Sequence, residues 1–388
     1  MVFHQCGEPL TDSEVQPGSD SHNGLWKIKQ KENSTLRINL CRAGAMLATV
    51  FLATALTVAG QEGRSVFVLT STNSASGNAV VVFQLDTVGT PSLTWVDTLP
   101  TGGNGGASGN AGILQFGGDF GAVANFASNS VSQLVREANL ISVGRTINLA
   151  PGCLNPDSVA LAKEHLYVVG TTCAESHAWP WGQIDGTVNL TDRTAAQIAV
   201  GRSWAAVTQT DGYLLQLPLT QFGALSGTFT DITLQPDADS VPLGEAFWGD
   251  VLGFTPAHSA ENFAIVSNGT EYPIPGTSFF SVPTQAPCWV AKGAGNIWYT
   301  GNSPGHAISI FFSDSQGGAF YKSVPLQLMG TPTDITVSPD RKWLAVIYTY
   351  QDEGYIAVYS IDAYGGLTYA ATSPSVGVAA FNGVAFSQ

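Results

Sequence analysis

The C-terminal part of the chain alternates short apolar runs with turns, and this pattern predicts a small antiparallel sheet. Within GTPTDITVSPDRKWLAVIYTYQDEGYIAVYSIDAYGGLTY (330–369), apolar runs at 334–337, 343–348 and 355–361 are separated by stretches that contain Pro, Asp and Gly. Short runs of branched and aromatic residues bounded by such turn residues are typical of β-hairpins. We therefore expect three strands here and a fourth at 367–369.

The same unit recurs along the chain. The second strands of successive units begin between Ser65 and Arg341, and six intervals over 276 residues give about 46 residues per repeat, the length of a four-stranded propeller blade. The sequence therefore predicts an all-β fold, a seven-bladed β-propeller of four-stranded antiparallel blades. The predicted innermost strands are 111–116, 157–162, 196–200, 250–254, 288–291 and 334–337.

The first unit lacks an innermost strand, and the end of the chain supplies a candidate for it. Residues 381–386 (FNGVAF) resemble the other inner runs and have no following partner. We expect them to pair with 66–69 and close the ring, which removes the exposed sheet edges that favour aggregation.

The N-terminal region predicts export. Residues 1–42 are polar and without apolar periodicity, so we expect a leader without a fold. Residues 43–60 are 18 residues without a charge, rich in Ala and Thr and ending in small residues, as in a signal peptide before its cleavage site. We expect cleavage near residues 58–60 and a secreted propeller at 61–388. A signal anchor that stays uncleaved, with the propeller outside the membrane, is the alternative.

Charge excludes two classes of partner. Only 11% of the residues are charged, and residues 61–388 contain 24 acidic against 10 basic residues. Such a surface repels nucleic acid and anionic lipid headgroups. We expect a monomer whose ligand is a small molecule or a carbohydrate.

Cysteine spacing and sequons fit an oxidising compartment. A hairpin that turns at Lys163 and Glu164 places residue 153 opposite 173 or 174, so we predict a disulfide between Cys153 and Cys173. The sequons NLT and NGT make Asn189 and Asn268 candidate glycosylation sites.

Propellers usually bind ligands at the mouth of the central channel, where the inner strands begin. The candidate binding residues at these positions are Asn110, Asn155, Asp157, Asp250, Trp289, Asp334 and Asn382. Longer loops add Glu175, His177, Trp179, Trp181, Glu245, Trp248 and His306. Asp and Asn at such positions also cap turns or tie blades together through backbone N–H groups, and this structural interpretation competes with the functional one.

Two kinds of chemistry are open to these residues. Asp157, Asp250 and Asp334 come from three blades, and carboxylates that converge need either protonation or a bound cation such as calcium. Otherwise we expect no cofactor. Glu175 and His177 could supply an acid and a base at a rim.

The repeat also carries a resemblance. TPTDITVSPDRKWLAVIY followed by GYIAVYSIDAYGGLTY resembles the lactonase-type seven-bladed propellers, which include bacterial 6-phosphogluconolactonases and fungal carboxymuconate cyclases. The likeness covers about 61–388 and looks closest to the secreted fungal branch. It implies a propeller that opens or forms lactones.

The chain departs from this family in two respects. Many members have a Pro-x-His step where this chain has GNAG at 109–112. The family's anionic substrates also need Arg or Lys in the pocket, and here Arg193 is the best remaining anion clamp. We therefore expect a neutral lactone, with a mouth carboxylate or His177 activating water and Arg193 or a cation steadying the oxyanion. The alternative is a binding propeller without catalysis, in which Trp179, Trp181 and Trp248 form a platform for carbohydrate or protein.

Overall fold

The computed structural model describes most of the chain after residue 64. The residues it describes are 65–107, 111–162, 164–180, 182–190, 194–232, 241–257, 264–267, 270–273, 287–303, 305–313, 319–321, 326–377 and 381–388. The predicted leader (1–42) and the apolar segment (43–60) lie outside these residues. In the part of the chain that is described, no helix is long and apolar enough to cross a membrane.

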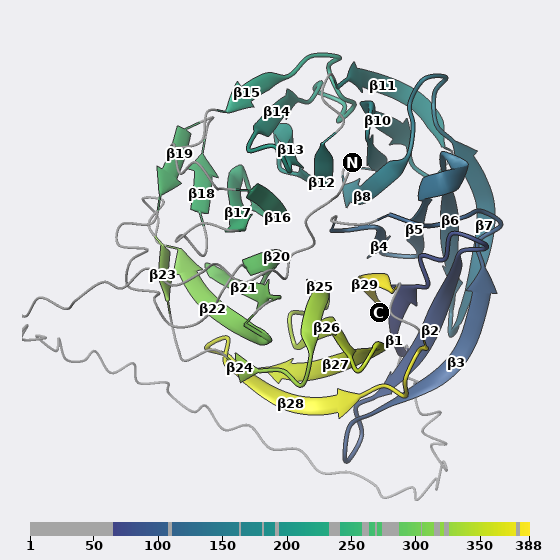
Figure 1. The fold of residues 1–388 in the computed structure, drawn as a ribbon, viewed down its shortest axis with the longest axis vertical. Coiled ribbons are helices and arrows are strands. Elements are labelled where there is room, and N and C mark those ends of the chain that lie inside the picture. Colours follow the sequence, from purple (N-terminus) through teal and green to yellow (C-terminus); the bar gives the residue numbers. More distant parts are fainter. Residues whose placement is uncertain are drawn as a thin grey trace, which may run out of the picture. The chain divides into compact units, whose positions relative to one another are not determined.

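The described strands form seven antiparallel sheets, arranged around a common centre in Figure 1. The first sheet contains β1 (Val66–Ser71), β2 (Ala79–Asp86), β3 (Ser92–Pro100) and β29 (Asn382–Ser387). The second contains β4 (Leu114–Gly117), β5 (Phe120–Asn125), β6 (Ser130–Glu137) and β7 (Leu140–Asn148), with the 3₁₀ turn η1 (Phe126–Ser128) after β5. The third contains β8 (Pro156–Ala162), β9 (His165–Gly170), β10 (Cys173–Ala178) and β11 (Gln183–Asn189).

The other four sheets follow in chain order. The fourth contains β12 (Ala195–Val200), β13 (Trp204–Gln209), β14 (Leu214–Pro218) and β15 (Thr230–Ile232). The fifth contains β16 (Val241–Trp248), β17 (Val251–Ala257), β18 (Ala264–Ser267) and β19 (Thr270–Pro273). The sixth contains β20 (Pro287–Lys292), β21 (Ile297–Asn302), β22 (Ala307–Ser313), β23 (Ala319–Tyr321) and β24 (Leu326–Gln327). The seventh contains β25 (Thr331–Val337), β26 (Trp343–Tyr350), β27 (Glu353–Ile361) and β28 (Leu367–Thr372).

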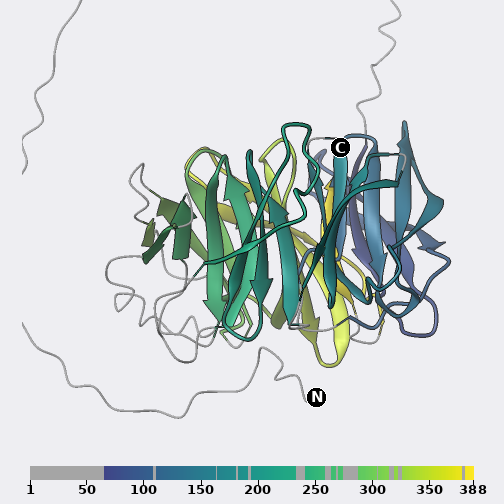
Figure 2. The ribbon, with the colours of Figure 1, turned by 90° about the horizontal axis from the view of Figure 1, so that it is seen from above.

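The fold is therefore an all-β propeller with four-stranded antiparallel blades, as predicted. Among the described residues, each sheet has four strands except the sixth, in which β24 is a fifth strand beside β22. The innermost strands β4, β8, β12, β16, β20, β25 and β29 each contact the next, and β29 contacts β4. Figure 2 shows the strands running between two opposite faces. We call the face where the inner strands begin the mouth face, and the face where they turn into the second strands the hairpin face.

The C-terminal strand belongs to the first sheet. β29 pairs with β1 over Phe67↔Ser387 to Ser71↔Asn382, with a register shift next to Ser71. Val384 and Phe386 of β29 pack in one apolar cluster with Val68 of β1. The last strand of the chain and the first are thus joined by both hydrogen bonds and apolar contacts.

Each sheet buries both faces against its neighbours, which explains the near-continuous apolar runs. In β26, Leu344 and Val346 face the sixth sheet, whereas Ala345 and Ile347 between them pack in the cluster that contains Val68. Successive side chains of a strand point to opposite faces. A strand that is buried on both faces therefore lacks the polar residue at every second position that a half-exposed strand has.

One predicted inner strand is wrong. The prediction placed it at 250–254, but β16 (Val241–Trp248) is the inner strand and Val251–Ala257 is the second. Pro242 and Gly244 made β16 look like a loop. Gly244 is required there, because a Cβ atom would lie 2.7 Å from the carbonyl oxygen of Cys288 in β20. Pro242 stands near the start of the strand, where a missing N–H is tolerated.

A buried arginine joins three strand ends on the hairpin face. The guanidinium of Arg136, at the end of β6, donates to the carbonyl oxygens of Ala138 and Ser65 and to Oγ of Ser387. It also lies over the ring of Phe67, 5.1 Å from the centroid. Arg136 therefore links the second sheet to β1 and β29.

Arg136→Met should destabilise the protein by roughly 2–4 kcal/mol, because it removes three hydrogen bonds that contribute about 0.5–1.5 kcal/mol each. Chemical unfolding of variant and wild type measures this. Lys342→Met is the matched control, since the Lys342 side chain is 73% exposed and pairs with the surface residue Asp340 at 3.5 Å. The control should change stability by less than about 0.5 kcal/mol. Equal effects of the two substitutions would contradict the role of Arg136.

Candidate functional site

β-Bulges at the start of the inner strands place polar side chains near the centre of the ring. The pairing register shifts next to Asp157 in β8, before Gln197 in β12, before Glu245 in β16 and before Asp334 in β25. A bulge leaves one residue out of the ladder and re-aims its neighbours. Glu245 was assigned to a loop and Gln197 was not predicted at all. The sequence feature that marks the start of four inner strands is a proline, namely Pro156, Pro242, Pro287 and Pro332.

The two residues Ala111 and Gly112, before β4, contact the inner strands of two other sheets. The carbonyl oxygen of Gly112 accepts the N–H of Val159 in β8 at 2.8 Å, and the N–H of Ala111 donates to Ala196 in β12 at 3.4 Å. A Cβ atom on Gly112 would lie 3.0 Å from Oγ of Ser158 and 3.4 Å from Nε2 of Gln197. Gly112 has φ +68°, so both its conformation and the close approach favour glycine.

Asp334 holds this segment and β29 in place. Its Oδ1 accepts the N–H of Ile335 at 2.8 Å, and its Oδ2 accepts the N–H of Val384 at 3.2 Å. Burial raises the pKa of Asp334 to about 7, and hydrogen bonds from Ile335, Val384 and the backbone of Gly112 keep it from rising further. Asp334 is thus a blade-joining residue, in line with the structural interpretation given to such carboxylates above.

Glu245 is buried with little compensation for its carboxyl group. It is 2% exposed, and neither carboxyl oxygen makes a hydrogen bond within the described residues, although its backbone pairs with the side chain of Gln197. Burial raises the pKa of Glu245 well above its ordinary value, and the nearby N–H of Ala199 offsets this only in part. Burial likewise raises the pKa of Asp157 on β8. Both carboxyls therefore keep a proton to higher pH than ordinary acids do.

Asp250 does not join the other two predicted acids. Its Oδ1 accepts the N–H groups of Arg202 and Ser203 at 2.9 Å each, and the hydroxyl of Ser203 at 3.0 Å, in a turn on the hairpin face. The expectation that Asp157, Asp250 and Asp334 converge is therefore wrong, because Asp250 follows the inner strand instead of beginning it. Among the described residues, the one group of three possible metal ligands is Cys153, Cys173 and Glu175.

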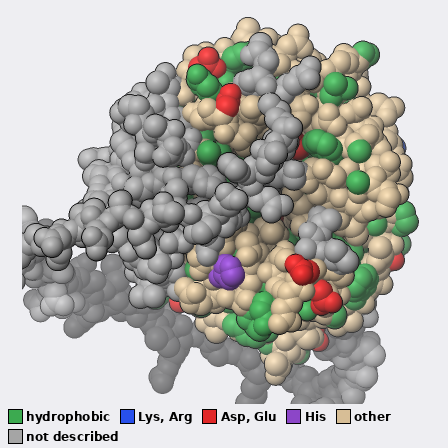
Figure 3. All heavy atoms as spheres, in the orientation of Figure 1, with side chains coloured by type: hydrophobic (Ala, Val, Ile, Leu, Met, Phe, Trp, Pro, Cys, Tyr) green, Lys and Arg blue, Asp and Glu red, His purple; other side chains and the backbone are tan. Residues whose placement is uncertain are grey.

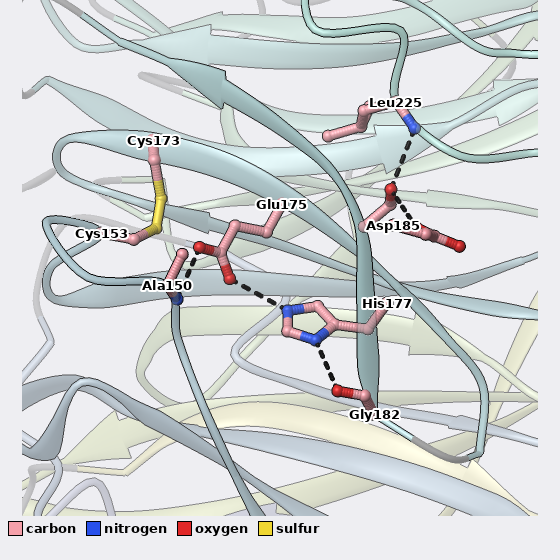
Figure 4. Close-up of polar contacts among 9 residues, drawn as sticks. Ala150, Cys153, Cys173, Glu175, His177, Gly182, Asp185 and Leu225 are labelled. Carbon is pink, nitrogen blue, oxygen red and sulfur yellow. Dashed lines mark hydrogen bonds and ion pairs between the residues drawn. A yellow bond between two sulfur atoms is a disulfide. The ribbon is translucent and has the colours of Figure 1, made fainter.

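Glu175 and His177 form a buried pair on β10, the third strand of its sheet. His177 Nε2 lies 3.0 Å from Glu175 Oε2, and both side chains are fully buried. Glu175 Oε1 accepts the N–H of Ala150 at 2.8 Å, and His177 Nδ1 donates to the carbonyl of Gly182 at 3.2 Å (Figure 4). The prediction placed both residues in a rim loop. They lie instead in a strand, with their polar groups used within the protein.

The alternation along β10 explains this burial. Glu175 and His177 face the second sheet, whereas Ser176 between them faces the fourth. Its Oγ accepts the N–H of Leu225, in the loop after β14, at 3.0 Å and donates to Asp185 in the neighbouring strand β11 at 2.6 Å. A polar stretch that is typical of a loop is a strand here because each polar group has a hydrogen-bond partner inside the protein.

The predicted disulfide is present. Cys153 and Cys173 are bonded, with their Cα atoms 5.3 Å apart. The strand pairing of β8 with β9 accounts for it, since Ala162 lies opposite His165 at the hairpin turn, as the residue count required.

The predicted tryptophans do not form a platform in the described residues. Trp179 packs edge-on against Phe120 in a core cluster, with ring centroids 5.9 Å apart. Trp289 is buried and donates from Nε1 to the carbonyl of Pro332 at 2.9 Å. Trp248 is 43% exposed at the end of β16, on the hairpin face, with Lys292 Nζ 5.4 Å from its ring centroid.

Three further predicted residues lie at the mouth face. The backbone N–H of Asn155 donates to Asn129 at 2.7 Å, which ties two sheets together. Asn382 is buried at the start of β29. His306 is exposed, and its Nε2 lies 3.2 Å from Oγ1 of Thr331. Asn110, Trp181, Arg193 and Asn268 lie outside the described residues, and Asn189 is exposed at the end of β11.

Basic side chains are absent from the described part of the mouth face. Among described Lys and Arg residues, Arg145 lies within the outer strand β7 and the others are at strand ends or turns of the hairpin face: Arg136, Arg202, Lys292, Arg341 and Lys342. The face seen in Figure 3 shows scattered acidic side chains and almost no blue among its described atoms. The described mouth face therefore has no fixed positive charge for an anionic ligand.

Comparison with known proteins identifies the fold. The chain matches no model of a known protein family and no curated protein sequence. Among solved structures, a protein from Lactobacillus plantarum is 15% identical with a TM-score of 0.62. The periplasmic gluconolactonase of Pseudomonas aeruginosa is 14% identical with a TM-score of 0.59. A provisional 6-phosphogluconolactonase of Bacteroides fragilis is 14% identical with a TM-score of 0.58. Each match covers 84% of this chain and 99% of the other, and at this identity the likeness establishes the fold alone.

The buried carboxyl of Glu245 predicts a pH dependence of stability. An acid whose pKa is raised in the folded state stabilises the protein below its unfolded pKa of about 4.3, and this stability is lost as pH rises towards the folded pKa. Glu245→Gln removes the ionisation, so the stability of the variant relative to wild type should grow with pH, by up to about 1.4 kcal/mol per pH unit in that window. Unfolding at several pH values tests this. Glu137→Gln, at the exposed end of β6, is the control; a pH-independent difference for Glu245→Gln would contradict the assignment.

The Glu175–His177 pair predicts coupled losses of stability. Glu175→Ala and His177→Ala should each cost roughly 3–5 kcal/mol, because either one leaves a buried polar partner unpaired. The double variant should cost at least about 1 kcal/mol less than the sum, since neither partner then remains. Chemical unfolding of all four proteins gives this coupling energy. His306→Ala, an exposed histidine, is the control, and strict additivity would show that the pair does not act as a unit.

Proposed function

We propose that this chain is a lactonase-like propeller that opens, or closes, the ring of a small neutral lactone at its mouth face. The observation that carries the proposal is the combination of a buried, proton-retaining carboxyl at an inner-strand start, Asp157, with a described mouth face free of Lys and Arg. The fold likeness to a gluconolactonase supports the same class of reaction. The absence of basic groups argues against a phosphorylated lactone, which needs cationic partners.

Asp157 is the residue that we assign to the proton transfer. Lactone hydrolysis requires a base that takes a proton from the attacking water and a donor that returns a proton to the leaving alkoxide, giving a hydroxy acid. A carboxyl whose pKa is raised by burial, as that of Asp157 is, suits this task better than an ordinary one. The reverse sequence of steps closes a hydroxy acid to the lactone with loss of water, whereas a cycloisomerase forms a lactone by adding a carboxylate and a proton across a carbon–carbon double bond. Glu175 and His177, with their polar groups satisfied inside the sheet, take a structural role in this proposal.

We further propose that the seven sheets are seven blades of one closed ring and that the chain is exported as a monomer of the secreted fungal branch. The pairing of β29 with β1 and the contact of β29 with β4 support the closed ring. The Cys153–Cys173 disulfide and the exposed Asn189 of a sequon support an oxidising compartment outside the cytoplasm. Neither a metal nor an organic cofactor is part of the proposed reaction.

The proposal predicts turnover of neutral lactones by the purified protein. Ring opening is followed by acid release over a panel that includes neutral, carboxylated and phosphorylated lactones, with and without a chelator. We expect turnover of neutral members, insensitivity to chelator, and a rate that rises with pH as Asp157 loses its proton. Asp157→Asn should lower the rate by about 10²–10⁴-fold. Asp340→Asn, on the hairpin face, should leave it unchanged.

Three outcomes would reject the proposal. A preference for phosphorylated lactones would overturn the argument from charge. An Asp157→Asn variant that folds and retains full activity would remove the assigned residue. No turnover of any lactone would favour the alternative, a propeller that binds carbohydrate or protein without a reaction.

A further inference from the structure

Three possible metal ligands converge beside β10. The Sγ atoms of Cys153 and Cys173 and a carboxylate oxygen of Glu175 all lie within 4.8 Å of one another. Cys173 and Glu175 are two residues apart in one strand, so their side chains share a face. Cys153 comes from the link between β7 and β8. All three residues are buried, and Figure 4 shows the sulfur atoms beside the carboxylate.

The link that carries Cys153 is held against β10 without the help of the sulfur atoms. The N–H of Leu154 donates to Oγ1 of Thr172 at 2.9 Å, and the N–H of Thr171 donates to the carbonyl of Leu154 at 2.9 Å. The hydroxyl of Thr172 donates to the carbonyl of Gly152 at 2.9 Å. Because these bonds surround Cys153 on both sides, cleavage of the disulfide leaves the two thiols next to each other.

The carboxylate is also fixed in orientation. Ala150 donates to Oε1 of Glu175 at 2.8 Å, His177 Nε2 lies 3.0 Å from Oε2, and the carbonyl of Gly182 fixes the other ring nitrogen of His177. Carboxylates that ligate metals are themselves hydrogen-bonded in this manner, and these outer partners tune metal affinity. The surroundings of Glu175 are thus those of an oriented ligand.

We propose that these residues form a redox-dependent zinc site. A dithiol reductant transfers two electrons and two protons to the Cys153–Cys173 disulfide, which gives two thiols, while the dithiol closes to its own cyclic disulfide. Zn²⁺ then binds the two sulfurs as thiolates, together with Glu175, and the two thiol protons are released. Two thiolates and a carboxylate, with one position left for water, are a donor set that suits tetrahedral zinc. In the oxidised protein the sulfurs are bonded to each other, and the site does not exist.

Cobalt titration of the full chain tests the proposal, because Co²⁺ bound to thiolates in a tetrahedral site absorbs strongly in the near-ultraviolet and visible. After reduction by a dithiol and its removal under anaerobic conditions, we expect one equivalent of Co²⁺ per chain, displaced by Zn²⁺. The oxidised protein should show no thiolate band. Glu175→Gln and His177→Gln should each weaken binding by about 10–100-fold. X-ray absorption of the reduced wild type should give two sulfur ligands and needs no variant to fold.

The controls separate this site from the three other cysteines of the chain. A Cys6→Ser/Cys41→Ser/Cys288→Ala protein should bind cobalt as wild type does, whereas Cys153→Ser/Cys173→Ser should lose the thiolate band. Retention of the band in the latter variant would place the metal elsewhere and overturn the proposal. A reduced wild type that binds no cobalt, or an absorption spectrum without two sulfur ligands, would overturn it as well.

Discussion

The burial of both faces of every sheet is the constraint on which the rest of this structure depends. Each blade packs between two neighbours, so side chains that alternate along a strand enter two different interfaces, as Leu344 and Ala345 do. A polar side chain in such a strand must find a hydrogen-bond partner inside the protein or remain protonated, because an unpaired buried charge is too costly. Asp334, Glu175 and His177 follow the first course. Glu245 follows the second.

The sequence predicted the architecture better than the chemistry, for physical reasons. Apolar alternation and turn residues locate strands, so the blade unit and the disulfide opposite a hairpin turn were accessible from spacing. β16 was missed because its proline and glycine, which normally mark loops, serve here to begin a strand and to let β20 approach. Glu175 and His177 were placed in a loop because polar residues normally mark loops, and the hydrogen bonds that satisfy them inside a strand are visible only in the folded protein. The partner of Glu175 lies 25 residues earlier in the chain, and such a bond leaves no local pattern.

Asp250 and Asp334 show that similar sequence positions can give acids different roles. Asp250 accepts hydrogen bonds in a surface turn, whereas Asp334 joins two inner strands. Position relative to the bulge, which depends on the start of the strand, decides which acids reach the centre. The prolines at 156, 242, 287 and 332 mark these starts more reliably than the acids do. The acids that reach the centre of such a ring are therefore those at the inner-strand starts, where the pairing register shifts.

Gly112 has a consequence for how unfolding spreads through the ring. Ala111 and Gly112 precede β4 of the second sheet, and their backbone bonds to β8 of the third sheet and to β12 of the fourth. In a ring of repeats whose sheets contact only their two neighbours, a local opening spreads from each sheet to the next. Here the second and fourth sheets are also bonded to each other directly. Loss of β12 would therefore weaken the attachment of the second sheet as well as that of its own neighbours, and these sheets would open together.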